Sequence, residues 1–97
     1  AKHGVIGLIR SLAADLAGTG TTANIVSPGS TATAPLDASA AIYGLDSVDD
    51  FARHQEPLGR LIDPAEVAAA IAWLCSPVAS AITGAVVPVD GGMTATP

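Results

Sequence analysis

Two short runs of small and β-branched apolar residues most constrain the fold of this chain. Residues 22–27 (TANIVS) end at a Pro-Gly pair, and residues 83–89 (TGAVVPV) end at an Asp-Gly-Gly turn. Neither run carries a charge, which is typical of strands buried inside a parallel sheet. A helical pattern lies between them. The order strand, helix, strand therefore predicts a right-handed parallel crossover.

A first helix is expected before these strands, over residues 2–17. Its apolar residues recur at three- and four-residue spacing and form one stripe. Gly18 and Gly20 follow and can adopt the left-handed backbone that ends helices. The stripe consists of Val5, Leu8, Ile9, Leu12, Ala13 and Leu16.

The helix between the strands has a clear start signal. Asp63 stands at the N-cap, Pro64 at the first helical position, and Glu66 closes a capping box. The apolar face of this helix ends at Cys75, which we expect to be a buried, inert thiol. Because the chain has one cysteine, an internal disulfide and a cysteine-cluster metal site are excluded.

The segment from residue 30 to residue 62 is long and polar, with weak helical patterning only over residues 47–54. A connection of this length inside a compact domain is usually functional, so we expect a lid or binding loop. The expected order is helix, strand, lid, helix, strand in an α/β fold, one end of a parallel sheet. Two parallel strands cannot bury both faces, so further strands are needed.

Composition and charge exclude several classes of protein. The chain is 49% hydrophobic and 13% charged, as in globular domains rather than disordered ones. Its net charge of −5 and four scattered Lys and Arg residues argue against a nucleic-acid partner. No apolar run approaches the roughly 20 residues of a membrane span. A cytoplasmic protein without a metal site is expected.

Ligand-binding residues are expected where the first strand ends, because open parallel sheets bind ligands beyond the carboxyl ends of their strands. Pro28 has no N–H, and Gly29 lets the backbone come close to a ligand. The hydroxyl groups of Ser30, Thr31 and Thr33 follow and can donate to carbonyl or phosphate oxygens. A Pro-Gly pair is also typical of a purely structural turn, so this motif alone leaves both readings open.

Four motifs in register resemble the C-terminal part of a classical short-chain dehydrogenase/reductase. The resemblance covers residues 1–97 and implies part of a single NAD(P)-binding, Rossmann-like, doubly wound domain, with residues 30–62 as the substrate lid. It also implies that the Gly-rich phosphate turn and the catalytic Tyr belong to a preceding part of a longer protein. The motifs are residues 1–8 (AKHGVIGL), 24–29 (NIVSPG), 59–60 (GR), and 82–84 (ITG) leading to 89–92 (VDGG).

In this family Lys2 corresponds to the catalytic lysine of the Tyr-x-x-x-Lys motif. It binds the nicotinamide ribose, and its charge lowers the pKa of the catalytic Tyr, because a nearby ammonium favours the phenolate. Tyr43 is no substitute, since it lies in the variable segment. The family places Pro28 and Gly29 against the nicotinamide. Thr33 corresponds to a Thr that contacts the carboxamide or a nearby phosphate.

Thr31 departs from the family pattern, since relatives commonly carry Ile or Val at its position. Its backbone remains suited to the carboxamide. Ser30-Thr31 is most similar to the 2,3-dihydro-2,3-dihydroxybenzoate dehydrogenase branch, which implies a cyclic alcohol or diol as substrate. His3 and Trp73 are expected to be surface or packing residues, and His54 lies in the lid.

The resemblance implies an NAD- or NADP-dependent oxidoreductase that interconverts a secondary alcohol and a ketone. One alternative is a 3-oxoacyl-[acyl-carrier-protein] reductase, although an acidic stretch suits an acidic carrier protein poorly. The other is an inactive fragment or pseudoenzyme that keeps only the association surface. A homotetramer is expected, with the helix of residues 64–75 and the strand of residues 83–89 at a subunit interface.

Overall fold

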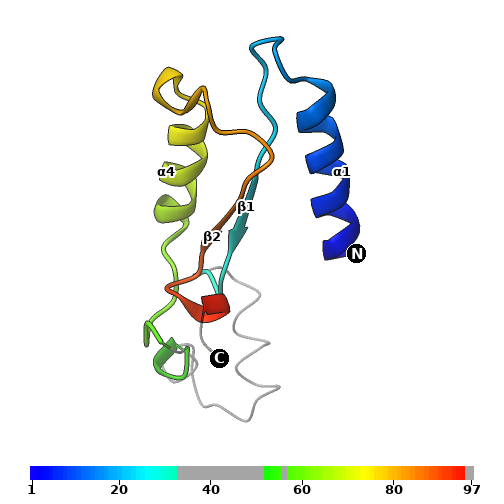
Figure 1. The fold of residues 1–97 in the computed structure, drawn as a ribbon. Coiled ribbons are helices and arrows are strands. Elements are labelled where there is room, and N and C mark those ends of the chain that lie inside the picture. The colour runs from blue at the N-terminus through cyan, green and yellow to red at the C-terminus, as the bar shows by residue number, and fades with distance from the viewer. Residues whose placement is uncertain (33–51, 56, 96–97) are drawn as a thin grey trace. The chain divides into compact units, whose positions relative to one another are not determined.

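The computed structural model describes residues 1–32, 52–55 and 57–95 of the chain. Within these residues, helices α1 and α4 and strands β1 and β2 form the framework, with short 3-10 helices near the C-terminal end (Figure 1). The elements are α1 (Lys2–Asp15), β1 (Ile25–Pro28), α4 (Pro64–Leu74), η1 (Pro77–Ala79), β2 (Val86–Val89) and η2 (Met93–Ala95).

The strands β1 and β2 pair in a two-stranded sheet. The Ile25 N–H donates to the Ala85 carbonyl at 2.9 Å, and the Gly29 N–H donates to the Val89 carbonyl at 3.0 Å. Both partners advance in the same direction, so the strands are parallel. The predicted α/β fold with a parallel strand–helix–strand crossover is confirmed.

The chain divides into two compact units. Residues 1–27 and 68–87 form the first unit, which contains α1, most of α4 and the first parts of both strands. Residues 28–67 and 88–97 form the second unit. The second unit therefore contains the carboxyl ends of β1 and β2, together with the start of α4.

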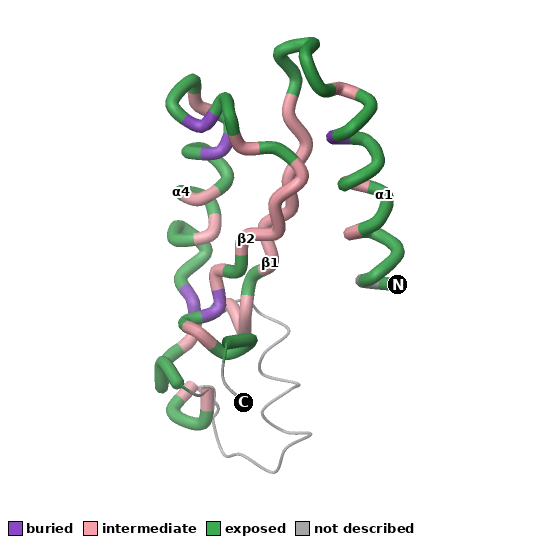
Figure 2. The backbone as a smooth tube through the Cα atoms, in the orientation of Figure 1, coloured by how far each residue is buried: buried purple, intermediate pink, exposed green. Residues whose placement is uncertain are grey.

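The first unit has a core of few and mostly small residues: Ala13, Leu74 and Ala79. The apolar stripe of α1 is only partly covered, because Leu8 remains 67% exposed while Ala13 is buried (Figure 2). Small residues bury little apolar area each, so this unit gains limited stability from its own packing. None of the helices in the described part of the chain is long and apolar enough to cross a membrane.

The strands are shorter than the sequence predicts, because a side chain replaces backbone pairing at their start. The Asn24 amide donates to the Ile82 carbonyl at 3.0 Å, and its side-chain oxygen accepts from the Ala85 N–H at 3.0 Å. Gly84 has φ +72°, which interrupts the extended backbone before β2. The regular strands consequently begin at Ile25 and Val86 rather than at residues 22 and 83.

The predicted helix signals are confirmed at both helices. The Asp63 side chain accepts from the Ala65 N–H at 2.8 Å, and Glu66 accepts from the Asp63 N–H at 3.0 Å, which completes the capping box. After α1, Gly18 and Gly20 have φ of 82° and 85°. The first helix ends at Asp15, two residues earlier than predicted.

Candidate functional site

The candidate site lies at the carboxyl end of β1, where the backbone of Gly29 packs tightly against the end of β2. The Gly29 N–H donates to the Val89 carbonyl. The atoms around the Gly29 Cα leave no room for a side chain. A Cβ at this position would lie 3.0 Å from both Cα and Cβ of Asp90. Glycine is therefore required for this close approach to Asp90, a contact that the sequence did not predict.

Thr31 also stabilises the backbone of Gly29. Its hydroxyl donates to the Gly29 carbonyl at 2.9 Å. Thr31 also forms a parallel bridge with Ile62: the Ile62 N–H donates to the Ser30 carbonyl and the Ala32 N–H donates to the Ile62 carbonyl, both at 2.9 Å. Within the described residues the N–H of Thr31 itself has no partner. A ligand at this strand end could accept a hydrogen bond from it.

Asp90 follows β2 directly, and its side chain organises the next turn. The residue is 8% exposed. One carboxylate oxygen accepts from the Gly92 N–H at 2.9 Å. The other accepts from the Thr94 hydroxyl at 2.7 Å and from the Thr94 N–H at 3.1 Å. The Thr94 hydroxyl and the Gly92 amide hold the pKa of Asp90 below its usual value, because these bonds favour the charged form.

The two glycines after Asp90 adopt positive backbone angles, with φ of 64° at Gly91 and 93° at Gly92. Both face the segment that leads into α4. A Cβ on Gly91 would lie 2.6 Å from Cβ of Leu58, and one on Gly92 would lie 3.3 Å from Cγ of Pro57. The second unit thus brings three chain segments together around the end of the sheet.

The structure places three of the predicted cofactor residues, Pro28, Gly29 and Thr31, at this strand end. Lys2 is the first residue of α1. Thr33 and Tyr43 lie outside the described residues, as does most of the segment predicted to be a lid. Sequence reasoning missed Asp90 as a neighbour of Gly29. An acidic residue directly after the adjacent parallel strand was the signal that could have identified it.

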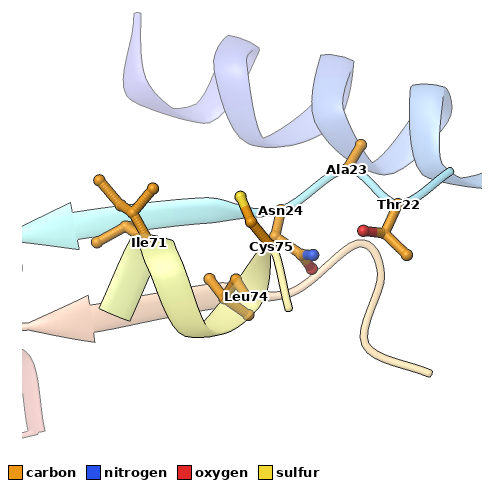
Figure 3. Close-up of a pocket in the computed structure, with 7 residues that line it drawn as sticks. Thr22, Ala23, Asn24, Ile71, Leu74 and Cys75 are labelled. Carbon is orange, nitrogen blue, oxygen red and sulfur yellow. The ribbon is translucent and has the colours of Figure 1, made fainter. Parts of the chain in front are cut away.

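A separate cavity of about 420 Å³ lies within the first unit (Figure 3). It opens between the start of β1 and the end of α4, and its lining includes Asn24, Ile71, Leu74 and Cys75. The expectation of a buried thiol at Cys75 is wrong for this structure, since the residue is exposed. The reason is that α4 ends at Leu74, and the face beyond it opens onto this cavity.

In the described ranges, no group of three or more His, Cys, Asp and Glu residues could hold a metal ion.

A family model described as enoyl-(acyl carrier protein) reductase matches residues 1–94 of the chain. The chain belongs to the short-chain dehydrogenase/reductase family. The match falls on the C-terminal part of this fold, as the sequence motifs predicted.

Individual members of the family agree with this assignment. The 3-oxoacyl-[acyl-carrier-protein] reductase of Vibrio cholerae is 44% identical over 93 residues, which are 96% of this chain and 36% of that protein. The cis-4-hydroxycyclohexanecarboxylate dehydrogenase of Sinomonas cyclohexanicum is 45% identical over 96 residues, 98% of this chain and 36% of that protein. The chain therefore spans about a third of the length of these short-chain dehydrogenase/reductase relatives.

A solved short-chain dehydrogenase/reductase shares the fold of this chain. The structure of a variant of actinorhodin polyketide ketoreductase with NADPH superposes with a TM-score of 0.81 at 36% identity, covering 95% of this chain and 38% of the ketoreductase.

Proposed function

We propose that this chain is the nicotinamide-side part of an NAD(P)(H)-dependent oxidoreductase that interconverts a secondary alcohol and a ketone. The observation that carries the proposal is the strand end at Gly29. There the Gly29 backbone lies beside the N–H of Thr31, for which the described residues provide no hydrogen-bond partner. This arrangement suits an amide-bearing ring, because a carboxamide oxygen beside this strand end can accept a hydrogen bond from the Thr31 N–H.

The residues of this chain would bind and orient the cofactor. Gly29 would admit the nicotinamide ring, and Thr31 would fix the carboxamide through its backbone. Lys2 would bind the ribose hydroxyls and favour the ionised form of the family's catalytic Tyr. The bound nicotinamide supplies hydride transfer to or from the substrate carbon. Thr33 remains a proposed phosphate or carboxamide contact on the strength of its position in the motif.

Both nicotinamide cofactors are candidates. The ketoreductase structure with NADPH supports NADP(H), since that protein shares the fold at 36% identity. The residues that select the 2′-phosphate in dinucleotide-binding folds follow the second strand of such a fold, which these 97 residues do not include.

A cyclic secondary alcohol is the substrate class that we favour. The relative that acts on cis-4-hydroxycyclohexanecarboxylate, at 45% identity, supports it. A dihydroxylated ring, as in the dihydroxybenzoate branch, is a narrower form of the same proposal. Reduction of a 3-oxoacyl group on a carrier protein is the second candidate, supported by the relative from Vibrio cholerae at 44% identity. The net charge of −5 disfavours contact between this stretch and an acidic carrier protein.

The test uses the full-length protein that contains this chain. NADH and NADPH binding is measured by nicotinamide fluorescence, and turnover is followed with cyclic secondary alcohols and with a 3-oxoacyl thioester. Faster turnover of the cyclic alcohols supports the first substrate class, and faster turnover of the thioester supports the second. A protein that binds neither nucleotide is not an oxidoreductase of this kind, and the remaining alternative, a pseudoenzyme that keeps its association surface, would stand.

A further inference from the structure

We infer that Asp90 is a positioning residue for the nicotinamide-side backbone, acting through Gly29. The inference rests on the proposed function, because it assigns Asp90 a role in holding the strand end where the ring would bind. Asp90 would not touch the cofactor or the substrate. Its carboxylate would fix the turn of residues 90–94, here named the Asp90 turn, and the Asp90 turn would fix Gly29.

The contacts form a continuous chain inside the second unit. Gly29 donates its N–H to the carbonyl of Val89, the residue directly before Asp90. The Cα of Gly29 faces the Cα of Asp90 so closely that a methyl group would not fit between them. A shift of the backbone at residues 89 and 90 must therefore move Gly29 as well.

Two backbone hydrogen bonds, from the Met93 N–H to the Asp90 carbonyl and from the Ala95 N–H to the Gly92 carbonyl, already hold the Asp90 turn. The carboxylate adds to them because the turn is costly to order. It contains two consecutive glycines, which lose more conformational freedom on ordering than other residues do. Three donors to the Asp90 carboxylate, from Gly92 and Thr94, offset that cost. Hydrogen bonds to a charged acceptor are stronger than neutral ones, so we expect this side chain to constrain the turn more than the backbone bonds do.

The test compares two ligands that differ only in the nicotinamide-bearing part. In the full-length protein, Asp90→Asn replaces one acceptor oxygen by a donor amide that must face the donors of Gly92 or Thr94. We expect the dissociation constant for NADPH or NADH, whichever the wild type binds better, to rise roughly tenfold. The matching fragment without nicotinamide, 2′-phospho-ADP-ribose or ADP-ribose, should bind to the variant and the wild type equally.

Two further variants sharpen the comparison. Thr94→Val removes one of the donors to Asp90 and should weaken binding of the whole dinucleotide in the same direction by a smaller factor. Asp63→Asn is the matched control, since it changes an aspartate of the same unit to a residue that also caps helices well. It should leave both dissociation constants unchanged.

The outcomes separate this inference from the proposed function. Selective loss of dinucleotide binding in Asp90→Asn supports the positioning role. Unchanged binding of both ligands refutes it, and so does an equal loss of both, which would indicate a general structural effect. If the wild type binds the fragment but gains nothing from the nicotinamide part, the nicotinamide-side assignment of the strand end itself is wrong.

Discussion

Gly29 lies where the ends of β1 and β2 approach each other so closely that an added methyl group would push them apart. Because the nearest atoms to an added Cβ belong partly to the Asp90 backbone, they cannot rotate away as a flexible side chain would. Sequence reasoning predicted a glycine here that lets the backbone come close to a ligand, and the structure shows a close contact within the chain instead. It did not predict which residue makes that contact, because the partner lies 61 positions further along the chain.

Replacing Gly29 by Ala should weaken nicotinamide nucleotide binding in the full-length protein. Overpacking of this kind lowers folding stability by about 1–3 kcal/mol, and the shift of the strand end that relieves it should raise the dissociation constant. Gly7→Ala is the control, since a Cβ there has no neighbour within 4 Å in the described structure. Fluorescence titration of both variants checks the prediction, and equal affinities for Gly29→Ala and wild type would contradict it.

A second prediction for a single residue concerns Lys2. In the full-length protein, Lys2→Ala should lower kcat on the order of a hundredfold, because ribose binding and activation of the catalytic Tyr would both fail. Lys2→Arg should recover only part of the rate, since the guanidinium keeps the charge but has different reach and donor geometry. The pH–rate profile is the decisive measurement. A profile that is identical in Lys2→Ala and the wild type would exclude a role in Tyr ionisation.

At the scale of single elements, the N-terminus of α4 shows how much local sequence can predict. Arg60 and Glu66 form a two-pronged ion pair, with nitrogen–oxygen distances of 2.7 and 3.1 Å. Glu66 also accepts from the Asp63 N–H, so one carboxylate satisfies the cap and the arginine together. The cap was predictable because it depends on neighbours in sequence. The arginine pair was not, since it depends on the path of the chain before the helix.

This ion pair predicts a specific pH dependence of stability. The hydrogen bond from Arg60, followed by the bond from the Asp63 N–H, lowers the pKa of Glu66 to about 2, and Arg60 has a raised pKa for the same reason. A carboxyl group whose folded pKa is lowered stabilises the fold above its unfolded pKa of 4.5, and that contribution disappears as the pH falls toward 2.

The full-length protein should therefore lose part of its stability between pH 4.5 and pH 2, and Glu66→Gln should lose less over that range. Thermal unfolding across the range measures the difference in Tm between wild type and variant. The two groups are partly exposed, so the difference should shrink at high salt. A constant Tm difference across the whole range would show that Glu66 does not titrate in this way.

The strand boundaries mark the limit of sequence reasoning for elements. Their apolar composition identified both strands, but the first residues of each run are not strand. Asn24 supplies a side-chain link to residues about 60 positions away, and such a link leaves no mark in local periodicity. The prediction that Cys75 is buried was wrong for a related reason. An apolar helix face predicts burial only where another part of the protein covers it.

At the scale of the whole molecule, apolar side chains remain uncovered in the first unit. Trp73 on α4 is 51% exposed, and Val78 in the 3-10 helix η1 is 78% exposed. The strand β2 itself contains no charged residue that would protect a sheet edge. We propose that α4 and β2 contribute to a subunit interface of a tetramer, as the resemblance to the family implies.

Val87→Asp should therefore dissociate the full-length assembly or cause it to aggregate, because a charge would be placed in an apolar contact. Light scattering at micromolar concentration measures the change. Thr21→Asp, at an exposed residue between α1 and β1, is the control and should leave the assembly intact. A wild-type protein that is already monomeric would show that this surface has another role.

The 97 residues on their own should show no dehydrogenase turnover. They lack a Gly-rich phosphate turn after a strand and a Tyr spaced four residues before Lys2, and both are needed for the proposed chemistry. Their small core also predicts a broad thermal transition without a sharp midpoint. Circular dichroism on heating, together with an assay of nicotinamide reduction, checks both statements. Turnover comparable to that of ordinary enzymes would overturn the first.

The bridge between Thr31 and Ile62 has a consequence for how such a protein can diversify. It joins the two ends of a 30-residue excursion of the chain by hydrogen bonds directly beside Gly29. Closing a flexible loop costs only about 0.6 kcal/mol more each time its length doubles. Insertions and deletions within the excursion can therefore accumulate at low thermodynamic cost while the bridge keeps its two ends in place. Evolution, or a protein engineer, could change the length of this segment without rebuilding the strand end on which its two ends are anchored.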